Sequence, residues 1–249
     1  MKEEILVFWL GNKRFGIRIS EVSEIVSLDG PFVEVPVKGT RFGSIGQVQV
    51  RERVLPVLNL RQLLGQSSWQ QYCSELSKLL AEREEDHRKW ITELDACVRE
   101  GRNFSLSLDG NGCAFGRWYN QFKTHDRRLG QMLKLFDIPH KKIHALGRDI
   151  LELATRSGKE AALERIALLR QAELSELLNL FAKTREILAI PVEPIGIMTR
   201  DLVLPVDNVE TIQSGELDTD GRVYVMGDGG LVPALQADLL RMEAMSEAA

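Results

Sequence analysis

Residues 51–90 read RERVLPVLNLRQLLGQSSWQQYCSELSKLLAEREEDHRKW, and this stretch changes character in its middle. Up to Gly65 the chain has short apolar and β-branched runs interrupted by Pro56, which is typical of strands and turns. After Gly65 it becomes rich in Leu, Ala, Glu, Lys and Arg, which favours a long helix. The stretch therefore predicts a junction between a β region and a helical region.

The same contrast extends over the whole chain. Residues 1–65 and 187–249 contain short strand-like segments, whereas residues 66–186 are helical in pattern and contain one proline, Pro139. This order predicts an α+β multidomain protein in which a helical unit is inserted into a split β domain; one α+β domain with a single large helical layer is the alternative. An even number of antiparallel helices returns the chain to its starting point. We expect a four-helix bundle, with helices at about 68–100, 112–136, 138–156 and 158–186, and a break near His125 is left open in the second of them.

The two β regions also resemble each other. IRISEVSEIV, residues 17–26, aligns with LPVDNVETIQ, residues 204–213, and RVLPVLNLRQLL, residues 53–64, aligns with GLVPALQADLL, residues 230–240. In the first pair a capping residue, Ser20 or Asp207, precedes apolar residues three apart, which predicts a short helix after each cap. Unless these short patterns coincide by chance, they indicate a duplicated β fold with the helical insert between its halves.

Composition restricts the classes of function. The 249 residues carry a formal net charge of −4 and no basic run, so we expect no nucleic-acid partner. No apolar run approaches the ~18 residues of a membrane span, and the N-terminus lacks the pattern of a signal peptide, so we expect a cytoplasmic protein without membrane insertion. Three cysteines are a poor basis for a disulfide framework, which leaves packing or metal binding as their roles.

The helical region holds a candidate metal site. His140 and His144 are four residues apart and share one helix face, while His87 and Cys113 lie on two other predicted helices. Three imidazoles and one thiolate suit Zn²⁺. Spacing alone leaves open a surface His-x-x-x-His pair beside an unrelated His and Cys. Four protein ligands would close the coordination sphere, which favours a structural or sensory zinc over a zinc hydrolase, so we expect no enzymatic activity and no catalytic residues.

Two families are similar to this chain. HRKW, CAFGRWY and PHKKIH, spread over about 70 residues from His87, resemble the chemoreceptor zinc-binding (CZB) domain. Matched one by one, the zinc ligands of that family fall on His87, Cys113, His140 and His144.

The flanking regions resemble CheW-like domains. The resemblance rests on EILVFWLGNKRFGIRISEVSEIV, GQVQVRERVLPVLNLRQLLG and LVPALQADLL, and it implies two SH3-like β barrels built from residues 1–65 and 187–249 around a bundle at 66–186. The family's Asn–Leu–Arg–Gly signature reads Gln49-Val50-Arg51-Glu52 here, which retains only the arginine. Arg51 is therefore the candidate partner-binding residue.

The resemblance implies a signalling role. The chain is expected to be a chemotaxis adaptor that couples a chemoreceptor to a CheA-type histidine kinase, with the bundle as a zinc sensor. The alternative is a sensor of hypochlorite-type oxidants that acts through the zinc-bound Cys113, because the thiolate is the reactive form of cysteine. A homodimer formed through the bundle is left open.

Overall fold

The chain forms two compact units of different class. The computed structural model describes residues 2–28, 44–190 and 195–240. One unit comprises Met1–Tyr72 and Pro191–Ala249, and the other comprises Cys73–Ile190. We call them the β unit and the helical unit. The predicted mixed α+β class is confirmed, with two β sheets in the first unit and helices in the second.

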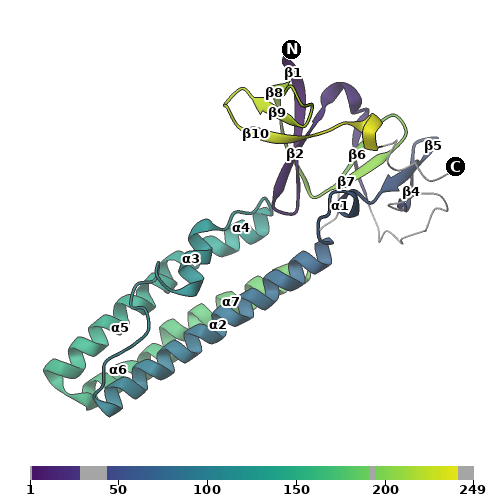
Figure 1. Ribbon diagram of the computed structural model, residues 1–249. Coiled ribbons are helices and arrows are strands. Elements are labelled where there is room, and N and C mark those ends of the chain that lie inside the picture. Colours follow the sequence, from purple (N-terminus) through teal and green to yellow (C-terminus); the bar gives the residue numbers. More distant parts are fainter. Residues whose placement is uncertain (1, 29–43, 191–194, 241–249) are drawn as a thin grey trace. The chain divides into compact units, whose positions relative to one another are not determined.

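Ten strands, one 3₁₀ turn and one short helix make up the described part of the β unit, together with the first residues of α2 (Trp69–Glu100) (Figure 1). In chain order they are β1 (Lys2–Leu10), β2 (Lys13–Arg18), η1 (Ile19–Glu21), β3 (Glu24–Ser27), β4 (Ser44–Val50), β5 (Arg53–Leu58), α1 (Leu60–Leu63), β6 (Ile195–Met198), β7 (Val203–Val206), β8 (Asn208–Leu217), β9 (Val223–Met226) and β10 (Leu231–Leu235).

The two sheets repeat one pattern of strand pairing. The first is a closed barrel in the order β8-β1-β2-β10-β9, with β9 returning to β8, and the second is a sheet in the order β3-β6-β7-β5-β4. In each, the third and fourth strands pair in parallel and the other neighbours pair antiparallel. Each sheet also draws strands from both sides of the helical insert. The strand pairing thus repeats in the way that the internal sequence similarity indicates.

Apolar side chains on both faces of β1 explain why the β unit holds together. Ile5, Val7 and Tyr224 are fully buried in one cluster with strands of the barrel. Their neighbours Leu6 and Phe8 point to the other face of β1 and join a larger core with residues of the second sheet. Because both faces of β1 are buried, this strand is apolar at successive positions rather than alternating with polar residues.

The short helices predicted after Ser20 and Asp207 are wrong. Val209 and Ile212 lie in the long strand β8, which pairs with β1, and Ile25 lies in β3. Backbone pairing with a neighbouring strand overrides the local three-residue spacing. The Asp207 carboxylate caps no helix and instead accepts hydrogen bonds from the Gly11 N–H and the Arg61 guanidinium.

The second sheet is not closed by backbone pairing among the described residues. Its outer strands are β3 and β4. Arg51, in the turn that joins β4 to β5, pairs through its guanidinium with Glu24 of β3 at 3.1 Å. A side-chain ion pair therefore links the two edges that a closed barrel would join by hydrogen bonds.

The helical unit contains long helices that run side by side, together with shorter ones (Figure 1). In chain order these are α2 (Trp69–Glu100), α3 (Ala114–Gln121), α4 (Arg127–Lys134), α5 (Asp137–Ser157), α6 (Lys159–Leu169), the π-helical segment η2 (Arg170–Leu174) and α7 (Ser175–Ala189). The second predicted helix is broken near His125, the place left open from the sequence, into α3 and α4, because the Asp126 side chain caps a new helix there. None of the described helices combines the length and apolarity needed to cross a bilayer.

Candidate metal centre

Four side chains from three parts of the helical unit converge on one point. His87 comes from the middle of α2, Cys113 is the N-cap of α3, and His140 and His144 lie one turn apart on α5. One ligand atom of each lies within 4.8 Å of those of the others. The three imidazoles are buried and the thiol is half-buried. The structure therefore brings together all four residues that the sequence pattern indicates as a metal site.

Backbone carbonyls fix how two of the imidazoles face the centre. His87 Nδ1 lies 2.7 Å from the Arg83 carbonyl, and His144 Nδ1 lies 3.1 Å from the Ser107 carbonyl. Each Nδ1 must donate, which leaves Nε2 as the neutral acceptor, the atom that could bind a metal. Within the described residues the Nε2 atoms of His87 and His144 are buried without a hydrogen-bond partner.

The donor set fits a zinc ion. A buried polar atom without a partner costs about 1–3 kcal/mol, and a bound cation would remove that cost for both Nε2 atoms. His140 Nε2 lies 3.2 Å from Cys113 Sγ, so the remaining two donors face each other across the same point. Three nitrogens and one sulfur form a preferred tetrahedral set for Zn²⁺.

Burial keeps the histidines in the form that binds metal. It lowers the pKa of His140 to about 3, helped by the neighbouring His87 and His144. It likewise lowers the pKa of His144 to about 4 and the pKa of His87 below its ordinary value. All three imidazoles are therefore neutral at neutral pH, with a lone pair available.

Cys113 is positioned by the start of α3. Its Sγ accepts a hydrogen bond from the Gly116 N–H at 3.2 Å, as an N-cap side chain does. Burial raises the pKa of the Cys113 thiol. A cation at the centre would instead hold the sulfur as a thiolate, and the helix N-terminus would favour that negative charge.

Aromatic rings enclose the histidines. The Phe115 ring packs edge-on against His140 at 4.8 Å between centroids, and it also lies 5.1 Å from the rings of Phe136 and Phe181. Trp90 lies 5.1 Å from His144. These rings keep solvent away from the centre on those sides, and a low-dielectric surrounding strengthens metal–ligand attraction.

Other residues singled out from the sequence lie elsewhere. Cys73 and Cys97 are buried on α2, and His125 is half-buried between α3 and α4; none of them belongs to the cluster. Arg51 is 80% exposed and has a φ of +56°, a left-handed conformation that costs a non-glycine residue about 1–2 kcal/mol. Sequence reasoning missed the Arg83 and Ser107 carbonyls, because backbone acceptors carry no signature in residue type.

Sequence profiles of known families match both parts of this arrangement. Residues 87–151, which span all four converging side chains, match the chemoreceptor zinc-binding domain (CZB). Residues 4–89 match the CheW-like domain. The chain combines a CheW-like domain with a chemoreceptor zinc-binding domain. No curated protein matches the chain.

The two matches meet within α2. The CheW-like match ends at residue 89 and the CZB match begins at residue 87, so the two share residues 87–89 of α2, among them His87. Strands β6 to β10 lie outside either match, although they pair with β1, β2, β3 and β5 in the two sheets. The CheW-like and CZB domains associate the chain with chemotaxis, signal transduction and zinc binding, and both are typical of signalling modules rather than enzymes.

Proposed function

We propose that this protein is a cytoplasmic chemotaxis adaptor that couples a chemoreceptor to a CheA-type histidine kinase and reports zinc through its CZB domain. The observation that carries the proposal is the convergence of His87, Cys113, His140 and His144 in a unit whose chain leaves and re-enters a CheW-like β unit. We take β6 to β10 as the second half of the CheW-like domain, with two SH3-like barrels, and the helices as a four-helix bundle. This assignment is supported by the repeated strand pairing in the two sheets.

Zinc binding is the first part of the proposal. The four residues would hold one Zn²⁺ per chain, and the bound ion would hold Cys113 as a thiolate and join three helices. We expect metal analysis of the purified, zinc-supplemented protein to give about one equivalent. His140→Ala should remove most of the metal, whereas His125→Ala, outside the cluster, should retain it. A wild-type content under a third of an equivalent would contradict the assignment.

Coupling to the β unit is the second part. His87 lies on α2, which begins at Trp69 within the β unit and runs without a break to Glu100. At 1.5 Å per residue, His87 is about 27 Å along the helix from its start, so a change at the metal must travel along packed helices. Arg185 of α7 pairs with Glu84 of α2, one turn before His87. A ligand-dependent shift of α2 is therefore shared with α7, which leads back to the β unit.

The experiment measures affinity for the kinase and for the receptor signalling tip, with zinc and with a chelator. We expect zinc to change the affinity of the wild type several-fold, which corresponds to coupling energies of about 1–3 kcal/mol. Cys113→Ala should give one affinity in both conditions. If the wild-type affinity is the same in both conditions, the helical unit does not control partner binding and is not a zinc sensor.

Arg51 is the residue proposed to contact a partner. It lies in an exposed turn, its backbone is held in a costly conformation, and its side chain is held toward Glu24 by an exposed ion pair that a partner could replace. Strained exposed residues are frequent at functional surfaces. Arg51→Ala should weaken partner affinity while leaving zinc content unchanged.

Oxidant sensing is a second candidate function. Cys113 is the one ligand of the cluster that is half-exposed, so an oxidant in solution reaches the sulfur more easily than the imidazoles. Oxidation to a sulfenic acid would remove the thiolate ligand and release zinc. The test compares zinc release by hypochlorite and by hydrogen peroxide against Cys113 modification measured by mass spectrometry. Release without modification of Cys113 would exclude this route. A zinc hydrolase is a weaker candidate, because four protein donors leave no position for a reactive water.

A further inference from the structure

The segment that joins α2 to Cys113 lies along α2 although it contains no helix or strand. Residues 102–107 run back toward the metal centre and bond to one face of the helix at intervals of three and four residues. His87 is the next residue on the same face. The contacts, in order from the end of α2, are Cys97 Sγ to the Asn103 carbonyl at 3.4 Å, Ser105 Oγ to Glu93 at 3.1 Å, and Trp90 Nε1 to the Ser107 carbonyl at 2.8 Å.

The last contact of this series reaches a proposed zinc ligand. The Ser107 carbonyl accepts from Trp90 Nε1 and also faces His144 Nδ1, so its position determines how His144 presents Nε2. The Ser107 hydroxyl donates to the Asp109 carbonyl at 2.9 Å, and that carbonyl accepts from the Cys113 N–H at 3.2 Å. The placement of Ser107 therefore influences both a nitrogen ligand and the sulfur ligand.

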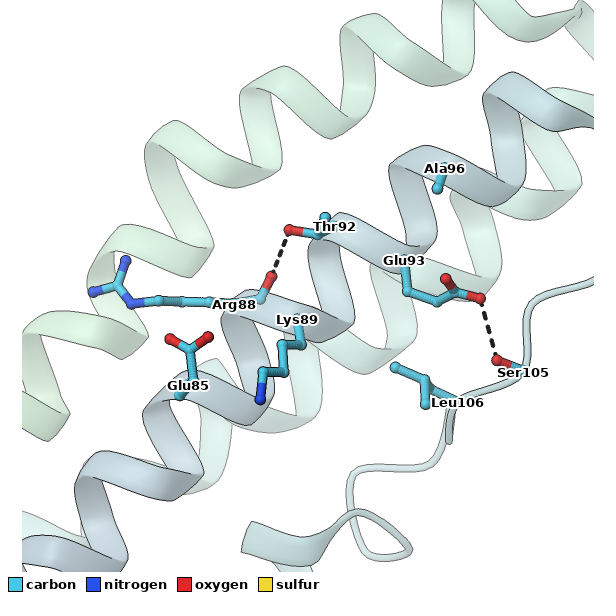
Figure 2. Close-up of a pocket in the computed structure, with 8 residues that line it drawn as sticks. All are labelled: Glu85, Arg88, Lys89, Thr92, Glu93, Ala96, Ser105 and Leu106. Carbon is cyan, nitrogen blue, oxygen red and sulfur yellow. Dashed lines mark hydrogen bonds between the residues drawn. The ribbon is translucent and has the colours of Figure 1, made fainter.

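One carboxylate on α2 gathers the bonds that hold the segment. Glu93 accepts from both Nη atoms of Arg102 at 2.6 and 2.8 Å, in the forked geometry that makes such pairs strong. It also accepts from Ser105 Oγ. These donors hold the pKa of Glu93 at about 2, so it is ionised at physiological pH. Figure 2 shows the hydrogen bond from Ser105 to Glu93 of α2; both residues and Leu106 line one open pocket.

We propose that Glu93 is a positioning residue of the metal centre. By holding Arg102 and Ser105 against α2 it fixes the extended segment, so that the Ser107 carbonyl orients His144 and the following turn places Cys113. Glu93 touches none of the four ligands and acts only through the segment. The inference rests on the proposed zinc-binding function and adds a residue that the CZB ligand set does not contain.

The test measures Zn²⁺ affinity by competition with a chromophoric chelator. Outer partners of metal ligands typically change affinity by 10–100-fold, so we expect Glu93→Gln to weaken binding about tenfold and Arg102→Ala to do the same. The double variant should bind no more weakly than the poorer single variant, because both lose one interaction. Asp95→Asn is the matched control: Asp95 lies two residues away and pairs with Arg99 and Arg170, outside the segment, and its variant should bind like wild type.

A second readout separates positioning from a loss of stability. Co²⁺ replaces zinc in such sites and reports the sulfur ligand through its thiolate charge-transfer absorption. We expect Glu93→Gln to weaken or shift this absorption and Asp95→Asn to leave it unchanged, whatever their melting temperatures without metal. A Glu93→Gln protein with wild-type zinc affinity and cobalt spectrum overturns the proposal. If Glu93→Gln does not fold, the same two measurements on Ser105→Ala test the proposal: wild-type zinc affinity and a wild-type cobalt spectrum would overturn it. A wild type that binds no zinc would instead refute the proposed function.

Discussion

Gly116 lies three residues after Cys113 and has no space for a side chain. A Cβ at this position would lie 1.8 Å from the Gly110 carbonyl oxygen, which is backbone and cannot rotate away. The close approach brings the Gly116 N–H to the Cys113 sulfur and the 107–112 turn to the histidines. A glycine in the string CAFG is thus part of the geometry of the proposed sulfur ligand.

Gly116→Ala should therefore damage both stability and metal binding. Overpacking of this kind costs about 1–3 kcal/mol of folding free energy. Here it would also separate the 107–112 turn from the start of α3, where Cys113 lies. Chemical denaturation of the metal-free protein and zinc content would measure the two effects. Gly130→Ala is the control, because Gly130 lies within α4 and its Cβ would meet only the methyl group of Thr124, at 3.7 Å. That variant should gain about 0.5–1 kcal/mol from reduced backbone freedom. Equal behaviour of the two variants would contradict the role given to Gly116.

Helix α4 exists as a separate helix because of its cap. Asp126 accepts hydrogen bonds from the Arg128 and Leu129 N–H groups and also pairs with the Arg128 side chain. Burial alone would raise the pKa of Asp126, but the bonds from Arg128 and Leu129 outweigh it and leave the pKa below its ordinary value. The ionised carboxylate is thus favoured by folding.

Replacing this cap gives a prediction with a defined pH dependence. Asp126→Ala should lower the free energy of unfolding by about 1 kcal/mol at neutral pH, whereas Asp126→Asn, which also caps, should lose less. Because the pKa of Asp126 is lowered in the folded state, its contribution is complete above the ordinary aspartate pKa of about 3.9 and disappears as the pH falls through the folded-state value. Urea denaturation of the metal-free proteins over a pH series measures it; a difference that grows on acidification would have the wrong sign.

The elements also show which parts of the structure are accessible from sequence. The pairing of His140 with His144 is predictable, since a four-residue spacing puts both on one face of a helix. Cys113 is predictable for another reason, because the motif around it is specific. The helices expected after Ser20 and Asp207 are wrong, because a three-residue spacing does not distinguish a helix from a strand whose partner lies about 200 residues away. The bonds between α2 and residues 102–107 are beyond sequence patterns, because they arise from an irregular segment that folds back on its own helix.

The β unit depends on contacts between distant parts of the chain. Arg61 of α1 pairs with Asp207, which lies between β7 and β8, and the two side chains are only 15% and 10% exposed. Breaking a buried pair leaves an uncompensated charge and costs about 3–5 kcal/mol. The pair therefore helps to hold the N-terminal segment to the C-terminal one.

Asp207→Ala should accordingly be among the most destabilising changes in the β unit, by about 3–5 kcal/mol in thermal or chemical unfolding. The control is Glu210→Ala, which breaks the Arg14–Glu210 pair in the same unit. These side chains are 32% and 33% exposed, so the loss should be below about 1 kcal/mol. Similar losses for both variants would mean that the Arg61–Asp207 pair is no more than a surface contact.

Removing the helical unit tests whether the two β segments form one domain. Replacing residues 73–190 by a short Gly-Ser linker should leave a folded β-rich protein that unfolds cooperatively, since the entropy of closing a loop grows only slowly with its length. Circular dichroism and a denaturant titration would show it. An unfolded product would mean that the helices are needed for the core of the β unit.

The pairing of early strands with late ones has a consequence for biosynthesis. β2 and β5 have parallel partners, β10 and β7, that the ribosome adds more than about one hundred residues later. At about 5–20 residues per second, the N-terminal strands wait on the order of ten seconds for these neighbours. The intervening helical segment is synthesised in that interval. All of its residues are therefore available to pack together before either sheet has all of its strands. The nascent N-terminal strands expose unpaired apolar edges during that time, so newly made chains should depend on chaperones before translation ends and far less once it is complete.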